Sequence, residues 1–178
     1  MTEAAEYNTE ALLSEWQWLV PSVDTPLFIS VFGDWFFGNP DGSLWLLSVL
    51  EGDYIQLARN AQEYNTFNKS GEWLEQNFIA GWQPIAAGHG MSPSRNECLG
   101  WKVHPLLGGN FEVANLQIFS MAVYQALMGQ LHFQQQQQQQ QIPSRKKPWY
   151  KLWWKLALTS HRTGPVLRGS ILARGFGR

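Results

Sequence analysis

Four histidines and one cysteine are the residues of this chain best suited to metal binding or catalysis. The histidines are His89, His104, His132 and His161. No two of them are three or four positions apart, the spacing that lets one helix present two ligands to the same metal ion. We therefore expect each histidine to be structural or solvated, and we expect no metal site. Cys98 has no second cysteine to pair with in this sequence, and because Leu99 and Trp101 follow it in a predicted strand, we expect a buried, unreactive thiol.

Two glycine-rich stretches resemble catalytic or phosphate-binding loops only superficially. Residues 107–109, Leu-Gly-Gly, lack the Gly-Lys-Ser/Thr ending of a P-loop and the three-glycine spacing of a dinucleotide site. Residues 88–93, Gly-His-Gly-Met-Ser-Pro, lack the Gly-x-Ser-x-Gly pattern of a nucleophile elbow. A tight turn and a surface loop account for them better. We expect no catalytic residue and no cofactor, and therefore a protein that is not an enzyme.

The charged residues are divided sharply along the chain. All 14 acidic residues lie between Glu3 and Glu112, and residues 1–133 carry only four Lys or Arg, which gives this segment a net charge of −10. Residues 134–178 carry +9 and no acid. A body this acidic repels nucleic acid and attracts basic protein surfaces. We expect its partner to be a basic protein, and we expect the body to bind no nucleic acid directly.

Six acidic residues are the candidates for partner contact. They are Asp34, Asp41, Glu51, Asp53, Glu72 and Glu75. Two interpretations remain open, a surface that only keeps the protein soluble and a docking surface that speeds the encounter with a basic nuclease. Asp34 follows Phe32-Gly33, where a carboxylate can accept backbone N–H groups, and a turn-anchoring role is favoured there over partner contact.

The elements that must position these residues alternate between strand-like and helical patterns, which predicts an α+β fold. We expect an antiparallel meander packed with several helices. An amphipathic helix is predicted over 9–19, ending before Pro21, and turns over 38–42 and 51–53 separate aromatic strands. The predicted strands are 26–32, 35–37, 43–47, 54–57, 98–103, 111–113 and 116–119. The predicted helices are 60–67, a helix capped by Ser70 that runs through Phe78, and a closing helix over 121–131, with a surface loop over 81–96 and a tight turn over 105–109.

The chain is expected to form one acidic domain over 1–133, a polyglutamine linker over 134–141 and a poorly ordered basic tail over 142–178. Within the tail, Trp149, Leu152, Trp153 and Leu156 share one face of a predicted short helix over 147–158. This pattern is typical of an interfacial membrane helix or a nucleic-acid-binding arm. Two other interpretations are a sequence without selected function, which is favoured, and a tail that folds back on the acidic body.

The start of the chain and its apolar runs bear on localisation. The first ten residues, MTEAAEYNTE, are acidic and polar where a secretory signal begins with basic residues. No apolar run is long enough to span a bilayer. We expect a cytoplasmic protein.

Several short motifs in a fixed order resemble one family. They are Trp16-x-Trp18-Leu19, Phe32-Gly33-Asp34, Asp41-Gly42-Ser43-x-Trp45-x-Leu47, Gly52, Lys102-Val103-His104-Pro105-Leu106-Leu107-Gly108-Gly109, Asn115 and Gly129-Gln130-Leu131-His132-x-Gln134. Over about residues 7–134 the chain resembles the C-terminal domain of bacterial type VI secretion immunity proteins that neutralise a DNase effector, a family also found as short standalone proteins. Two positions depart from the pattern, since His104 stands where a second proline is frequent and Phe133 replaces a basic residue. Fuller members carry a separate N-terminal domain, of which we expect no counterpart here.

The resemblance implies an immunity protein that binds a cognate toxin, a basic nuclease, and catalyses nothing. It also implies structural roles for a set of motif residues: Trp18, Gly33, Asp34, Gly42, Trp45, Gly52, Pro105, Leu107, Gly108, Gly109, Asn115 and Gln130. The alternative function is a membrane- or nucleic-acid-associated adaptor that acts through the basic tail.

Overall fold

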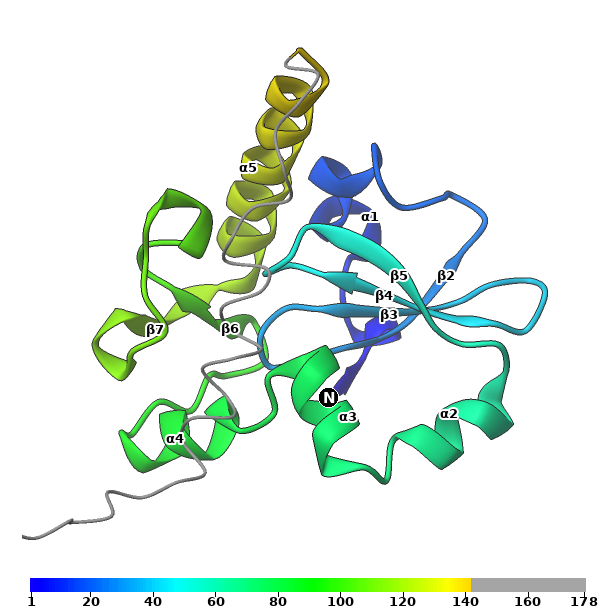
Figure 1. Cartoon of the computed structure of the whole chain (residues 1–178), viewed down its shortest axis with the longest axis horizontal. Helices are drawn as coiled ribbons and strands as arrows, with labels where there is room; N and C mark the ends of the chain where they lie inside the picture. The colour runs from blue at the N-terminus through cyan, green and yellow to red at the C-terminus, as the bar shows by residue number, and fades with distance from the viewer. Residues whose placement is uncertain (142–178) are drawn as a thin grey trace, which may run out of the picture.

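The computed structural model describes residues 1–141, and it confirms the α+β class (Figure 1). The strands are β1 (Thr2–Glu3), β2 (Thr25–Ile29), β3 (Trp35–Gly38), β4 (Leu44–Ser48), β5 (Asp53–Ala58), β6 (Glu97–Trp101) and β7 (Leu116–Ser120). The α-helices are α1 (Thr9–Leu12), α2 (Ala61–Phe67), α3 (Gly71–Phe78), α4 (Trp82–Gly88) and α5 (Met121–Gln141). Short 3₁₀ helices are η1 (Ala4–Glu6), η2 (Ser14–Trp16), η3 (Pro105–Leu107) and η4 (Val113–Asn115).

The larger sheet is an antiparallel meander in the order β1-β2-β3-β4-β5. The turn between β3 and β4 forms where the Asp-Gly pair predicts it. There Gly42 has φ +86° and donates its N–H to the Asn39 carbonyl, while the Asp41 carboxylate accepts from Ser43 N at 2.8 Å. β1 is a two-residue strand beside β2 and was not predicted, because two residues show no periodicity.

A second sheet pairs β6 with β7, and α5 follows β7 directly (Figure 1). Gly100 in β6 lets β6 and α5 pack closely together. A Cβ atom at this position would lie 2.4 Å from the Tyr124 ring of α5. The side of this sheet away from α5 packs against α4 through Trp101 and Trp82, whose rings meet edge to face at 5.0 Å.

Three predicted elements are wrong in part. The helix over 9–19 is instead α1 followed by η2, with no continuous helix to Leu19. The surface loop over 81–96 contains α4, which holds Pro84 in its first turn, where a missing N–H costs no hydrogen bond. Residues 111–113 form no strand, and the chain enters η4 at Val113.

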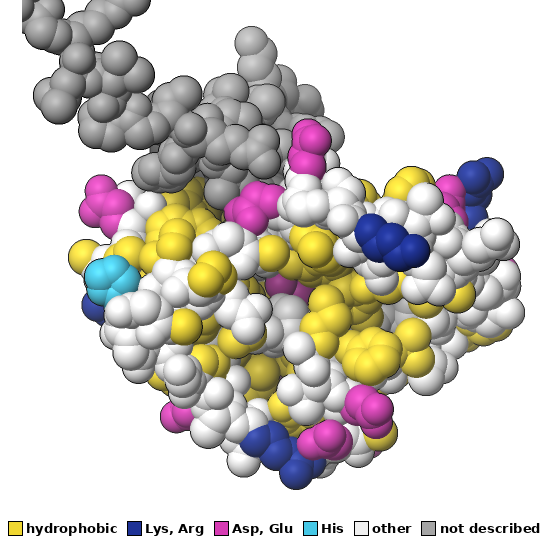
Figure 2. Space-filling view, turned by 90° about the horizontal axis from the view of Figure 1, so that it is seen from below, with side chains coloured by type: hydrophobic (Ala, Val, Ile, Leu, Met, Phe, Trp, Pro, Cys, Tyr) yellow, Lys and Arg dark blue, Asp and Glu magenta, His cyan; other side chains and the backbone are white. Residues whose placement is uncertain are grey.

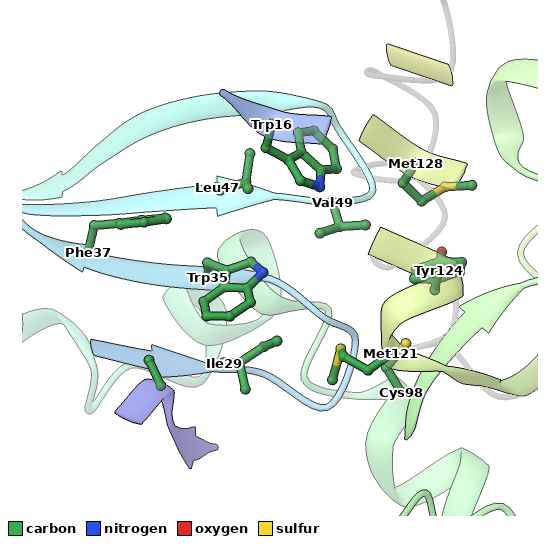
Figure 3. Close-up of a cluster of buried hydrophobic side chains, with 11 residues drawn as sticks. Trp16, Ile29, Trp35, Phe37, Leu47, Val49, Cys98, Met121, Tyr124 and Met128 are labelled. Carbon is green, nitrogen blue, oxygen red and sulfur yellow. The ribbon is translucent and has the colours of Figure 1, made fainter. Parts of the chain in front are cut away.

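The main core lies between the meander and α5. Trp35, Leu47 and Val49 face Tyr124 and Met128 across this space (Figure 3). The 3₁₀ helix η2 adds the fully buried Trp16, and Gly129 of α5 sits so close to the Glu15 backbone that a Cβ atom would lie 2.7 Å from its carbonyl oxygen. The N-terminal segment and the last described helix therefore close the core together.

α5 continues from the core through the glutamine run to Gln141. The expected basic tail over 142–178 and its helix over 147–158 lie outside the described residues. Among the described helices, none combines the length and the apolar character needed to cross a membrane.

Candidate protein-interaction site

Asp34 is buried and holds two loops of the meander together. Its side chain is 4% exposed, Oδ1 accepts from Val49 N at 2.9 Å, and Oδ2 accepts from the Ser30 hydroxyl at 2.9 Å. Burial raises the pKa of Asp34 to about 6, against the lowering effect of those hydrogen bonds. The carboxylate thus joins the β2–β3 loop to the turn after β4, and it is not accessible to a partner.

Two histidines from distant parts of the chain meet beside this turn. The rings of His104 and His132 lie 5.3 Å apart and nearly perpendicular, and both residues are buried. His132 Nε2 is 3.0 Å from the Val49 carbonyl, and His104 Nδ1 accepts from Leu106 N at 3.3 Å. Burial, helped by the neighbouring His132, lowers the pKa of His104 to about 3, so His104 is neutral at physiological pH.

The buried side chains of this region have structural roles. Burial raises the pKa of the Cys98 thiol to about 12, which suppresses the nucleophilic thiolate. Among residues 1–141, no group of three or more His, Cys, Asp or Glu side chains is placed to hold a metal ion.

Asn115 fixes the loop that contains the Leu107-Gly108-Gly109 turn. Its Oδ1 accepts from Val103 N, and its Nδ2 donates to the carbonyls of Val103 and Asn110, at 2.8–2.9 Å. Gly109 is required by contact, since a Cβ atom there would lie 1.7 Å from the Val103 carbonyl oxygen. Gly108 is required by conformation, with φ +89°. These contacts fix the backbone path of the loop, and Leu107 at its tip is 64% exposed.

Most of the remaining motif residues are buried or half-buried. Trp18 donates its indole N–H to the Glu15 carbonyl, and Trp45 donates to the Ser43 hydroxyl. Pro105 is buried, and Gly33 with φ +86° lies against Gln125, whose Nε2 donates to the Gly33 carbonyl. Gly52 lies against the ring of His132. Apart from Leu107, the motif residue with an exposed side chain in the described part of the chain is Gln130 on α5.

The predicted acidic contacts do not gather in one patch. Asp41 is exposed at the β3–β4 turn, whereas Glu51 and Asp53 are half-buried at the β4–β5 turn. These turns lie at opposite ends of β4, and five residues of strand separate them by roughly 16 Å. On α3, Glu72 is exposed and accepts from Gln76, while Glu75 uses one oxygen to accept from Gly81 N at 2.6 Å.

The structure instead brings exposed apolar side chains together on the sheet face opposite α5. Phe28, Phe36, Leu46 and Ile55 are directly paired across β2 to β5, so they lie on one face. Phe36 and Leu46 in the middle of this row are buried, whereas Phe28 and Ile55 at its ends are 40% and 41% exposed.

Helices α2 and α3 cover the middle of this row with aromatic rings. Tyr64 and Trp73 meet edge to face at 5.7 Å, and Phe67 lies 6.2 Å from Trp73. Phe67 is 38% exposed and the other two are half-buried. We call the five residues Phe28, Ile55, Tyr64, Phe67 and Trp73 the aromatic face. Among the residues of these helices, the predicted partner contacts were only the acidic Glu72 and Glu75. The spacing of Tyr64 and Phe67, three positions apart, already places them on one helical side.

Carboxylates border the aromatic face. Glu3 pairs directly with Phe28, and Asp53 alternates with Ile55 onto the same side of β5. Glu72 lies in the first turn of α3, beside Trp73. The molecule seen from the side of α2, α3 and α4 shows apolar side chains gathered around a hollow, with carboxylates mainly toward the edge of the view (Figure 2).

One comparison with known proteins finds a match to a family model over part of the chain. Residues 58–132 match the family model described as T6SS immunity protein Tdi1, C-terminal. This match confirms the resemblance drawn from the motifs, over a range that runs from the end of β5 into α5. Of the six candidate acidic residues, Glu72 and Glu75 lie within the matched range. The other four, Asp34, Asp41, Glu51 and Asp53, precede it. No curated protein matches the chain.

Proposed function

We infer from the match of residues 58–132 to the Tdi1 C-terminal immunity family that this protein binds and neutralises a cognate toxin delivered by a type VI secretion system. That match is the observation that carries the proposal. The toxin is a basic nuclease, and the two proteins form a stoichiometric complex with no turnover. The protein acts in the cytoplasm, where an incoming nuclease meets its substrate.

The charge distribution supports a basic partner. The net charge of −10 over residues 1–133 speeds the encounter with a cationic protein and disfavours nucleic acid as a ligand. A nuclease presents a cationic groove to DNA, and a bound acidic protein competes for that groove. Occlusion of the active site therefore explains neutralisation without a catalytic step.

Calorimetric titration of the purified full chain with the toxin encoded beside it tests this function. We expect saturable binding at one-to-one stoichiometry and loss of nuclease activity at the same molar ratio. Toxin expressed in a susceptible cell should kill it unless this protein is co-expressed. Absence of binding at micromolar concentrations, together with unprotected cells, contradicts the proposal.

A further inference from the structure

We propose that the aromatic face, and not the acidic turns of the meander, is the surface on which the toxin docks. The proposal rests on the immunity function above and names the site that performs it. The occupant is a cationic protein surface with an apolar centre, contributed by the toxin.

The residue types of this face are those that dominate binding energy in protein interfaces. Aromatic side chains are enriched among interface hot spots because they bury a large area with few rotatable bonds. Here four aromatic side chains and one isoleucine remain partly exposed around a buried centre of Phe36 and Leu46. Monomeric proteins rarely leave such a group of large apolar side chains uncovered without a role in recognition.

The rings are held in place before a partner arrives. Phe78 stacks on Phe36 at 4.9 Å and meets Trp73 edge to face at 5.5 Å. The Ser70 hydroxyl caps α3 by accepting from Trp73 N, and Asn60 caps α2 in the same way through Glu63 N. Binding on a preorganised surface loses less side-chain entropy, which favours affinity.

The charges around the face select a basic partner. Glu3, Asp53 and Glu72 border it. Of the two cations near α2, Arg59 is neutralised by an ion pair with Glu63 at 2.8 Å, whereas Lys69 forms no ion pair within residues 1–141. An arginine of the toxin can stack on the Trp73 indole while its guanidinium meets a carboxylate. An apolar centre with an acidic border therefore complements a DNA-binding surface better than it complements another acidic protein.

A second exposed apolar strip serves as a matched control. Val123 and Leu127 on α5 are 53% and 50% exposed, on a helix side away from the core. Residues 121–141 contain no Asp, Glu, Lys or Arg. Mutation of this strip also removes exposed apolar area, but the strip carries no charge that would attract a basic partner.

The test compares two double variants of the full chain, Ile55→Thr with Phe67→Ser on the aromatic face and Val123→Ser with Leu127→Ser on α5. Calorimetry with the toxin's nuclease domain should show Kd raised by about 10- to 100-fold for the first variant. The second should bind like the unmodified chain. Glu72→Lys should slow association and weaken its dependence on salt. Thermal melts of each variant establish that all of them fold.

The possible results distinguish a failure of the docking surface from a failure of the immunity function. If the unmodified chain does not bind toxin, the immunity function fails. If it binds and the aromatic-face variant binds equally well, the function stands and the docking surface is wrong. If that variant instead changes the chain's own oligomeric state, or exposes residues 142–178 to hydrogen exchange without changing toxin affinity, the face is covered by a second copy or by the tail, and the proposal is overturned.

Discussion

The imidazole of His132 occupies the space that any side chain at position 52 would need. A Cβ atom on Gly52 would lie 2.2 Å from His132 Nδ1, and Gly52 has φ +63°. The turn after β4 is therefore possible only with glycine at this position. Sequence alone predicts the turn, but it cannot show that a residue eighty positions later fills the adjoining space.

Gly52→Ala should destabilise the protein by about 2–4 kcal/mol, since the methyl group collides with a buried ring and the backbone is left-handed. Urea unfolding measures this loss. Gly42→Ala is the matched control, because Gly42 has φ +86° but nothing within 4 Å of the added atom. It should lose only about 1 kcal/mol. Equal losses in the two variants would show that contact with His132 has no energetic effect.

Asp34 and His104 give the stability opposite dependences on pH. The pKa of His104 is about 3 in the folded protein against 6.5 ordinarily, so its contribution is complete above pH 6.5 and is lost as the pH falls toward 3. The pKa of Asp34 is about 6 against 3.8 ordinarily, so its contribution is complete below pH 3.8 and is lost as the pH rises through 6. Between pH 4 and 6 the two contributions oppose each other.

Each single variant should therefore reveal the slope of the other group. Asp34→Asn should lose stability on acidification from pH 6 to 4 more steeply than the unmodified chain, because His104 is then unopposed. His104→Asn, which keeps an acceptor for Leu106 N, should lose stability less steeply. The full contributions are about 3 kcal/mol for Asp34 and about 5 kcal/mol for His104. Urea midpoints at several pH values measure the slopes, and parallel slopes in both variants would contradict the assignment.

At the scale of elements, local signals were sufficient where a strand or helix ends in a strong cap or turn. The Asp-Gly turn before β4 and the Ser70 cap of α3 are confirmed because each acts within four residues. The helix α4 was missed because its glycine and proline content favours a loop, and its helical state depends on Trp82 and Ala86 packing against β6 and β7. Tertiary contacts decided the structure there.

The hydrogen bonds that Asn115 makes to Val103 and Asn110 yield a prediction for the loop over residues 103–110. Asn115→Asp keeps the acceptor for Val103 N but replaces the N–H donor that serves the carbonyls of Val103 and Asn110. We expect a loss of about 2 kcal/mol and faster hydrogen exchange over residues 103–110. Asn65→Asp, an exposed asparagine on α2, is the control and should change stability little. Protection that is unchanged over the loop would contradict the role of Asn115.

At the scale of the whole molecule, the net charge can be predicted from the sequence, whereas the arrangement of side chains on the surface cannot. The net charge of residues 1–133 follows from counting, and it indicates the sign of the partner. The position of the acidic side chains does not follow, because Asp41 and Glu51 are close in sequence but point from opposite ends of β4. The aromatic face likewise depends on the register of four strands, which the sequence pattern does not determine.

Removing residues 142–178 should preserve binding to the toxin, because the family match and the aromatic face lie before this segment. The net charge changes from −1 to −10, so association at low salt should become faster and more dependent on ionic strength. Stopped-flow measurement of the association rate at several salt concentrations checks both the rate and its salt dependence. Loss of binding would assign the activity to the basic segment and favour the adaptor interpretation.

The packing of α5 between the N-terminal segment and both sheets has a consequence for synthesis on the ribosome. Trp35 and Leu47 emerge early, but Tyr124 and Met128, which cover them, are translated after both sheets. A nascent chain therefore exposes an apolar surface until α5 is complete, and chaperones or proteases can recognise it. Any product of premature termination before Gly129 lacks the contact with Glu15 and should be degraded, so only ribosomes that finish this helix yield a protein that persists in the cell.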